Sequence, residues 1–280
     1  MASPAAPLAS LDLIHRAIEV DIAYTISRMQ VLERLPGNPV GIAYRRIGDR
    51  IAALMARHLP SPSFNRVVGL RAGDERHLAP LVAWNRQHGV DARFDMVTGD
   101  HDATLGRELA AHGYYHSDFH AALACGPGDP IAAPPAADIE RVATAAAMED
   151  FLAAYVAGWG FPKDQHERFK ANVRPWLYQP GWSLYLARAD GRPAATATLF
   201  IQGNTAYCAD ATTDPAFRRR GLHSALMHRR ISDATAAGVE LVTGGAEFLS
   251  ASYRNMERIG LRLMFMRAIW SPLPEPREPS

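Results

Sequence analysis

The sequence predicts a mixed α/β fold of the α+β type, divided into two tandem domains, and three observations lead to this prediction. Helix-like and strand-like segments alternate along the 280 residues, a pattern typical of a sheet flanked by helices. The order of these segments in the first half returns in the second half. Two pairs of short landmarks return with it, which indicates a duplication: "GDR" (48–50) with "DGR" (190–192), and "LAAHGY" (109–114) with "MERIGL" (256–261).

The first half opens with a predicted helix over residues 11–35, because its apolar residues recur every three or four positions and "PGNP" ends the pattern. Two strands are predicted around Gly48 and Asp49, although residues 52–58 fit a helix equally well. The remaining elements follow as strand, helix, strand, helix and strand, over 64–70, 75–89, 92–97, 102–113 and 114–124.

Residues 125–137, "CGPGDPIAAPPAA", are rich in Pro, Gly and Ala, a composition typical of a linker. The sequence therefore predicts a first domain over 1–127, a linker over 128–138 and a second domain over 139–271. The last residues, 272–280, are polar and proline-rich, and we expect a disordered tail there.

The second domain is predicted to begin with two helices, over 147–160 and 163–177. Two strands then join at the turn "DGRP", and a third strand leads into an arginine-rich turn. A helix, a strand, a helix and a strand complete the domain. The predicted strands span 182–189, 194–202, 205–213, 239–245 and 261–270, and the last two helices begin at 222 and 250.

The composition limits the partners that the protein is expected to have. Its 30 basic and 29 acidic residues give a net charge of +1, which argues against a general nucleic-acid or membrane-surface binder. The two cysteines, Cys125 and Cys208, have no disulfide or zinc spacing, and they fit a reducing cytoplasm. The N-terminus lacks the pattern of a secretory signal, and no stretch of about 18 apolar residues occurs. We therefore expect a cytoplasmic protein.

The arginine-rich turn, "DPAFRRRGLHSALM" (214–227), carries the most specific signal. The strand before it ends near Thr213, three arginines follow, and Gly221 precedes a helix. A helix start exposes backbone N–H groups and partial positive charge, so this turn is expected to bind an anion, best a phosphate. An arginine run before a helix is also typical of a solvated surface. The spacing of the residues excludes a Walker loop and a Rossmann turn.

With its surroundings, this turn resembles motif A of the GNAT superfamily of acyl-CoA N-acyltransferases, whose pattern is Arg/Gln-x-x-Gly-x-Gly/Ala. Arg218 and Gly221 match the first two marked positions, whereas His223 stands at the third. The helix end "NMERIGL" (255–261) is similar to the end of motif B in that family. The resemblance extends over about residues 148–270.

The resemblance implies a GNAT fold, in which a mostly antiparallel sheet contains a splayed pair of parallel strands, here around 211–213 and 243–245. The pantetheine arm of coenzyme A lies in that gap. The implied activity is an acetyl-CoA-dependent N-acetyltransferase, in which an amine attacks directly in a ternary complex. Asp74 and Glu75 occupy the matching turn of the first domain and would repel phosphates. We therefore expect a degenerate GNAT-like first domain without a cofactor.

For acetyl-CoA, the resemblance points to residues around the turn and on the motif B helix: Ala211, Thr212, Thr213, Arg218, Arg219, Arg220, Gly221, Leu222, His223, Ser224, Ala225, Ser252 and Asn255. The backbone of Thr212 or Thr213 is expected to polarise the thioester carbonyl, and Asn255 to bind the pantetheine amides. Ser252 fits the role of a helix cap equally well.

Catalysis needs a group that takes the amine proton, and Asp210 and Glu247 are the candidates. Either carboxylate would also be stable in solvent without a catalytic role. The family's tyrosine acid in motif B is replaced here by Met256. Tyr253, nearly one helical turn earlier, and Tyr207 on the central strand are the alternatives, and both also fit packing roles.

The acceptor is expected to be a small-molecule or amino-acid-like amine. The residues expected to bind it are Trp159, Phe161, Tyr207, Gly244 and Gly245, although aromatic residues next to helices more often belong to the core. The alternative function is a non-catalytic acyl-CoA-binding module that regulates a partner. The sequence leaves open whether two copies of the chain form a homodimer.

Three histidines, His112, His116 and His120, have the four-residue spacing of metal ligands on a helix. Gly113 and the aromatic pair after it indicate that the helix ends first. No metal is therefore expected.

Overall fold

The computed structural model describes residues 10–59, 61–129, 131–133 and 135–274. They divide into two compact units. Unit 1 comprises the residues up to Tyr24 together with Ala121–Met264, and unit 2 comprises Thr25–His120 and the residues from Phe265 onward. Three elements run from one unit into the other: α1 (Leu11–Glu33), β5 (Tyr114–Cys125) and β11 (Arg262–Pro272). The units are thus divided differently from the predicted domains, 1–127 and 139–271, which stay a prediction.

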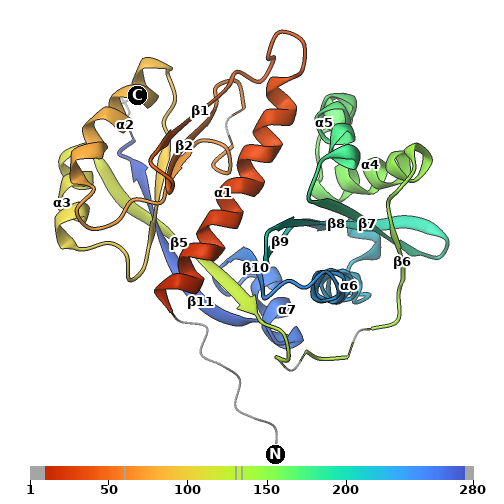
Figure 1. The fold of residues 1–280 in the computed structure, drawn as a ribbon. Coiled ribbons are helices and arrows are strands. Elements are labelled where there is room, and N and C mark those ends of the chain that lie inside the picture. The colour runs from red at the N-terminus through yellow and green to blue at the C-terminus, as the bar shows by residue number, and fades with distance from the viewer. Residues whose placement is uncertain (1–9, 60, 130, 134, 275–280) are drawn as a thin grey trace, which may run out of the picture. The chain divides into compact units, whose positions relative to one another are not determined.

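Unit 1 is a sheet with helices on both faces. Its strands follow the order β5-β10-β9-β8-β7-β6, antiparallel from β6 to β9. Figure 1 shows α4 and α5 on one face of β7–β9 and α6 on the other. Besides the shared elements, unit 1 contains β6 (Asp138–Arg141), α4 (Ala145–Trp159), α5 (His166–Val173), β7 (Trp182–Ala189), β8 (Arg192–Gln202), β9 (Thr205–Thr213), α6 (Leu222–Ala236), β10 (Leu241–Glu247) and α7 (Ala251–Ile259).

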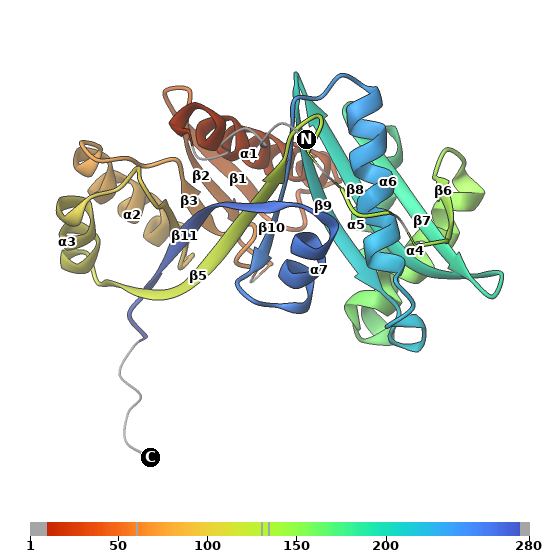
Figure 2. The ribbon, with the colours of Figure 1, turned by 90° about the horizontal axis from the view of Figure 1, so that it is seen from below.

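The strands β9 and β10 are parallel and separate along their length. Their pairing runs from Thr205 opposite Leu241 to Cys208 opposite Gly244. Beyond that point β9 continues to Thr213 and β10 to Glu247, and Figure 2 shows the two strands diverging, with α7 near the gap. The predicted splayed pair is therefore confirmed. Each strand exposes backbone N–H and C=O groups where it loses its neighbour.

Local signals explain the ends of α4. The hydroxyl of Thr144 accepts a hydrogen bond from the N–H of Ala147 at 3.2 Å and caps the helix start. Gly160 follows the last helical residue with a φ of 70°, a left-handed conformation that favours glycine. The buried face of the helix packs against β8 and β9.

Two local predictions differ from the structure, and one alternative is decided by it. Where one helix was expected over 163–177, only His166–Val173 is α-helical (α5), and a 3₁₀ turn lies on each side of it. Pro175 in the second turn has no N–H to donate to an α-helical hydrogen bond, so α5 does not continue through it. The linker predicted over 128–138 ends in β6, which pairs with β7. The two strands predicted around Gly48 and Asp49 are confirmed as β1 (Ile42–Ile47) and β2 (Ile51–Ala56), and because β2 pairs on both sides, the helical alternative for residues 52–58 is excluded.

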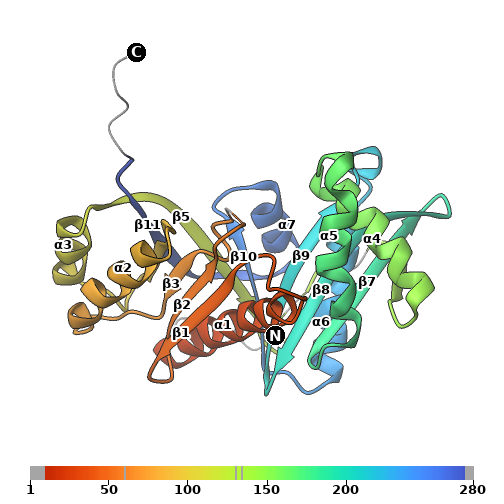
Figure 3. The same cartoon turned by 90° about the horizontal axis from the view of Figure 1, so that it is seen from above.

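Unit 2 repeats this plan in a sheet of order β1-β2-β3-β4-β11-β5. The pair β3/β4 is parallel, as β9/β10 is in unit 1, whereas the pairs β1/β2, β2/β3 and β4/β11 are antiparallel. Apolar residues of α2 (Leu78–Gln87) and α3 (Ala103–Ala111), the two helices that lie beside one another in Figure 3, form one buried core with apolar residues of the strands. Its own elements are β1 (Ile42–Ile47), β2, β3 (Arg66–Val68), α2 (Leu78–Gln87), β4 (Arg93–Val97) and α3 (Ala103–Ala111).

Two sequence predictions concern the chain ends. Most of the predicted tail, 275–280, lies outside the described residues, whereas Pro272 ends β11 and the N–H of Leu273 donates to the carbonyl of Gly113 at 2.8 Å. The first nine residues, whose sequence lacks the pattern of a secretory signal, also lie outside the described residues. No helix among the residues that the structure describes combines the length and apolar character needed to cross a bilayer.

Candidate active site

The turn between β9 and α6 requires a glycine. Gly221 stands at the N-cap of α6 with a φ of 76°, where an L side chain would be strained. A Cβ atom there would also lie 3.3 Å from the ring of Pro135. Because glycine has no side chain to cap the helix, the first N–H groups of α6 stay available to an anion.

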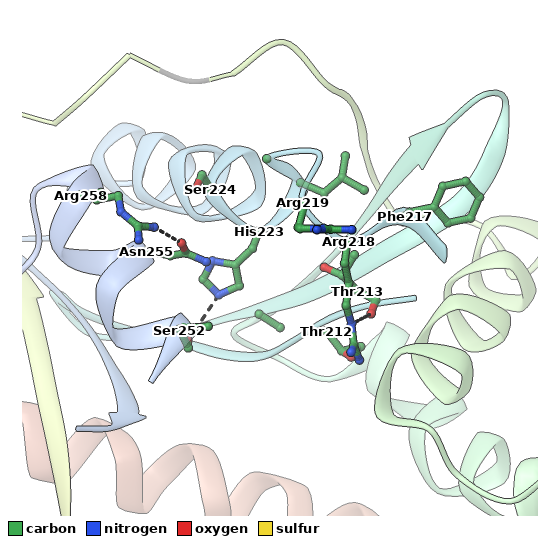
Figure 4. A pocket seen from close by; sticks show the side chains of 14 residues that line it. Thr212, Thr213, Phe217, Arg218, Arg219, His223, Ser224, Ser252, Asn255 and Arg258 are labelled. Atoms are coloured by element: carbon green, nitrogen blue, oxygen red, sulfur yellow. Dashed lines mark hydrogen bonds between the residues drawn. The ribbon is translucent and has the colours of Figure 1, made fainter. Parts of the chain in front are cut away.

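A cavity of about 670 Å³ opens at this helix start, between the turn and α7. Figure 4 shows side chains from the end of β9, the start of α6 and one face of α7 around it. Its walls contain these predicted coenzyme residues: Ala211, Thr212, Thr213, Arg218, Arg219, Gly221, Leu222, His223, Ser224, Ser252 and Asn255. The structure therefore brings together segments that are up to 44 residues apart in the sequence.

Two predicted coenzyme residues lie elsewhere. The guanidinium of Arg220 pairs with Asp190 at 2.7 Å and lies over the ring of Phe217, outside the cavity wall. Ala225 is buried in α6, directly after the wall residue Ser224.

The sequence analysis did not predict three residues of the cavity wall: Phe217, Ala251 and Arg258. The helical period contained the signal for two of them, because residues 251, 255 and 258 fall on one face of α7. Arg258 donates to the side-chain oxygen of Asn255 at 2.6 Å, which fixes both polar groups at the cavity (Figure 4). It adds a third cation to Arg218 and Arg219, in a wall that contains no acidic residue. This charge pattern suits a polyanionic ligand.

His223 projects into the middle of the cavity (Figure 4). Its Nε2 lies 3.4 Å from the hydroxyl of Ser252, whereas Nδ1 is buried and has no hydrogen-bond partner among the described residues. Burial and the positive charge of Arg230 lower the pKa of His223 to about 4. The imidazole is therefore neutral at pH 7, and its unsatisfied nitrogen is costly unless a polar ligand pairs with it.

Residues 131–248 match the family model of the acetyltransferase (GNAT) domain. The matched segment contains β9, the arginine-rich turn and α6, and it ends after β10. A comparison with curated proteins finds no match.

Solved structures show the same fold over most of the chain. A GCN5-related N-acetyltransferase from Kribbella flavida is 19% identical, with a TM-score of 0.62 over 92% of this chain and 96% of that one. A tandem GNAT protein from the clavulanic acid biosynthesis pathway is 15% identical, with a TM-score of 0.61 over 93% and 98%. A GCN5-related N-acetyltransferase from Sphaerobacter thermophilus is 16% identical, with a TM-score of 0.59 over 95% and 91%. The chain has the GNAT fold.

Within the GNAT fold, Asp210 lies on β9 directly before the cavity wall. It is half-buried, and its φ of 46° is in the left-handed region, which costs a residue other than glycine about 1–3 kcal/mol. The hydroxyl of Thr198 donates to its carboxylate at 3.4 Å. This strained, anchored carboxylate stands next to the backbone of Ala211, the first wall residue.

The other predicted catalytic groups lie away from the cavity wall. Glu247 is exposed at the end of β10. Tyr253 is buried against Phe248, and burial, together with a hydrogen bond to Glu257, raises its pKa. Met256, in place of the family's tyrosine, is buried.

The predicted acceptor residues fall into two groups, one at the end of α4 and one on the strands β9 and β10. Trp159, at the end of α4, is half-exposed, and Phe161 stacks on Phe169 at 3.7 Å. Gly244 is buried where β10 pairs with β9, and a Cβ atom added there would lie only 3.2 Å from the carbonyl oxygen of Cys208. Gly245 follows it at the point where the strands separate. Tyr207 on β9 is half-buried, and its ring centroid lies 5.0 Å from that of Tyr24 on α1.

In unit 2, the turn that corresponds to the arginine-rich turn contains the carboxylate of Asp74. Asp74 pairs with Arg50, with one oxygen 2.8 Å from Nη2, and accepts the N–H of Arg71 at 2.8 Å. The hydrogen bond from Arg50 lowers the pKa of Asp74, so it is ionised. The side chain thus supplies the negative charge that a phosphate would bring, where the sequence had predicted simple repulsion.

The three histidines with metal-type spacing do not share a helix. As predicted, α3 ends before Gly113, which has a φ of 85°, while His116 and His120 lie on β5. No group of three or more metal-ligating side chains occurs among the residues described.

Proposed function

We propose that the protein is an acetyl-CoA-dependent N-acetyltransferase that acts on the amine of a small molecule or an amino-acid-like compound. One observation carries the proposal: the cavity at the start of α6 combines available backbone N–H groups with three arginines, beside the strand that splays from its parallel neighbour. Both features suit a long ligand with a pyrophosphate at one end and amides along its arm. The match of residues 131–248 to the acetyltransferase (GNAT) domain supports it.

The residues present fit coenzyme A as the acyl carrier. Arg218, Arg219 and the N-terminus of α6 would hold the pyrophosphate. The buried Nδ1 of His223 and the side chain of Asn255 would pair with polar groups of the arm. The backbone N–H of Thr212 or Thr213 would polarise the thioester carbonyl as negative charge develops on its oxygen.

In the proposed reaction the neutral amine attacks the thioester carbonyl carbon directly. The N–C bond forms, the C–S bond breaks, and its electrons leave with the coenzyme thiolate. Asp210 is the group that we assign to take the amine proton, because it is held next to the wall residues of β9 and Glu247 is exposed at the end of β10. Solvent then protonates the thiolate, so no dedicated acid is required in place of Met256.

Unit 2 is proposed to be a degenerate GNAT-like domain, which makes the protein a tandem GNAT protein. The support is its parallel pair β3/β4 and the internal charge of Asp74 at the matching turn. A cytoplasmic location is proposed because Cys125 and Cys208 are both buried free thiols.

A thiol-release assay with acetyl-CoA and a panel of amines tests the proposal. We expect turnover by the wild type, and a KM for acetyl-CoA raised at least about tenfold by Arg218→Glu. The matched control is Arg174→Glu, which reverses the charge of an exposed arginine that pairs with Glu149 at 2.8 Å, away from the cavity. Equal KM values for the two variants would contradict the location of the acetyl-CoA site.

The alternative, a non-catalytic acyl-CoA-binding module, is favoured by the replacement of the family's tyrosine with Met256. Calorimetry separates the two functions. Tight binding of acetyl-CoA without turnover of any amine would support the binding module, and absence of binding would contradict both proposals.

A further inference from the structure

The strand β9 contains an irregularity directly before the cavity wall. Its pairing with β8 shifts register between Thr196 and Thr198, and Thr198 then lies opposite Ala209. The next residue, Asp210, takes the left-handed conformation with a φ of 46°. Such a conformation persists in a residue other than glycine only where its surroundings hold it, and it is often found at functional sites.

A buried arginine holds the backbone on both sides of the irregularity. Arg230 of α6 is fully buried, and its Nη1 donates to the carbonyl of Thr198 at 3.1 Å and to that of Ala209 at 3.3 Å. Its Nε donates to the carbonyl of Leu226 at 3.1 Å, which fixes the guanidinium on its own helix. The conformation of β9 at Asp210 is therefore anchored to the helix that begins at the cavity.

The carboxylate of Asp210 is held by a residue of α1. The hydroxyl of Tyr24 donates to Oδ2 of Asp210, the oxygen that also accepts from Thr198. The ring of Tyr24 is buried, and its centroid lies 5.2 Å from that of Trp182 and 5.0 Å from that of Tyr207. These contacts fix the ring whether or not it carries the hydroxyl, since both neighbours contact its aromatic part. All of these residues belong to unit 1.

We propose that Tyr24 is a positioning residue for catalysis, which orients the Asp210 carboxylate to receive the amine proton. This inference rests on the proposed function. As the N–C bond forms and the C–S bond breaks, one proton passes from the amine nitrogen to Asp210, and Tyr24 touches none of the reacting atoms. Tyr24 lies far outside the matched segment 131–248, so the first helix of the chain completes the catalytic unit.

A double-mutant cycle distinguishes this role from a structural one. Asp210→Asn is expected to lower kcat by about 10²-fold, the usual effect of losing a general base. Tyr24→Phe keeps the ring and is expected to lower kcat about tenfold, with an unchanged KM for acetyl-CoA. In the Asp210→Asn background, Tyr24→Phe should change kcat less than about twofold, because the two residues act through the same proton transfer.

The matched control is Tyr185→Phe. The hydroxyl of Tyr185 on β7 also donates to an aspartate, Asp233 Oδ2, at 2.8 Å, in the same unit but outside the cavity wall. We expect it to leave kcat within about twofold of the wild type. Melting temperatures and the calorimetric Kd for coenzyme A accompany each variant, and Tyr24→Phe is expected to keep the wild-type Kd.

Three results would overturn the assignment of Tyr24. They are a wild-type kcat in Tyr24→Phe, an equal fall of kcat in both backgrounds, or a weakened Kd for coenzyme A. A wild type that turns over no amine would instead overturn the proposed function, and the role of Tyr24 with it. The two failures are therefore distinguishable.

Discussion

Acidification is expected to destabilise the protein through His223, because the folded state holds its imidazole in the neutral form. The pKa of His223 falls from 6.5 to about 4 on burial beside Arg230. An unfolded chain binds a proton at this residue below about pH 6.5, whereas the folded chain does not until about pH 4. The free energy of unfolding that this difference contributes is therefore fully present above pH 6.5 and is lost as the pH falls towards 4.

The structure sets the size of the effect. Each pKa unit corresponds to about 1.4 kcal/mol, so the full shift amounts to about 3 kcal/mol, of which about 2 kcal/mol has been lost by pH 5. The side chain retains some solvent access at the cavity. We therefore expect a measured loss of about 1–2 kcal/mol at pH 5.

Urea unfolding at pH 5 and pH 7.5 measures this loss in the wild type and in His223→Gln. The comparison is needed because burial also lowers the pKa of His228. The variant should lose about 1–2 kcal/mol less than the wild type between the two pH values. The control His58→Gln replaces an exposed histidine outside the cavity wall, and it measures the effect of losing a histidine elsewhere in the chain.

Equal pH dependence of the free energy of unfolding in the wild type and in His223→Gln would refute this reasoning. It would mean that the imidazole gains a proton in the folded state as readily as in the unfolded one. A larger loss in the variant would reverse the sign that burial predicts.

Three further substitutions test the packing around the cavity. Arg230→Met removes the donors to the carbonyls of Leu226, Thr198 and Ala209 and should lower the free energy of unfolding by about 3 kcal/mol; an unchanged value in urea unfolding would show that the cost of burying the charge cancels these hydrogen bonds. Gly158→Ala places a Cβ atom 2.8 Å from Cγ2 of Thr212, so it should lower the free energy of unfolding by about 2 kcal/mol, although alanine favours a helix more than glycine does. Adding Thr212→Ala removes that contact and should restore most of the lost free energy. Gly221→Ala should cost about 1 kcal/mol at a φ of 76° and weaken coenzyme A binding in calorimetry; full affinity would contradict the role of this turn.

Much of the site could be predicted because its signals are local. The glycine turn, the arginines before it and the start of α6 follow one another in the sequence, and a helix start with this pattern has the same chemistry wherever it folds. Arg258 shares a helix face with Asn255, so its place in the cavity wall could have been read from the helical period. Arg220 looked equivalent to its two neighbours, yet its side chain turns to Asp190.

The sequence by itself determined the alternation of helices and strands and the anion-binding turn, because these depend on periodicity, glycine and helix ends within short stretches. Only the tertiary structure decided which distant residues serve that turn. The hydrogen bond from Tyr24 to Asp210 joins positions 186 apart, and Arg230 meets Thr198 across 32. Strand pairing and helix packing set such contacts, and no periodic pattern within either segment encodes its partner.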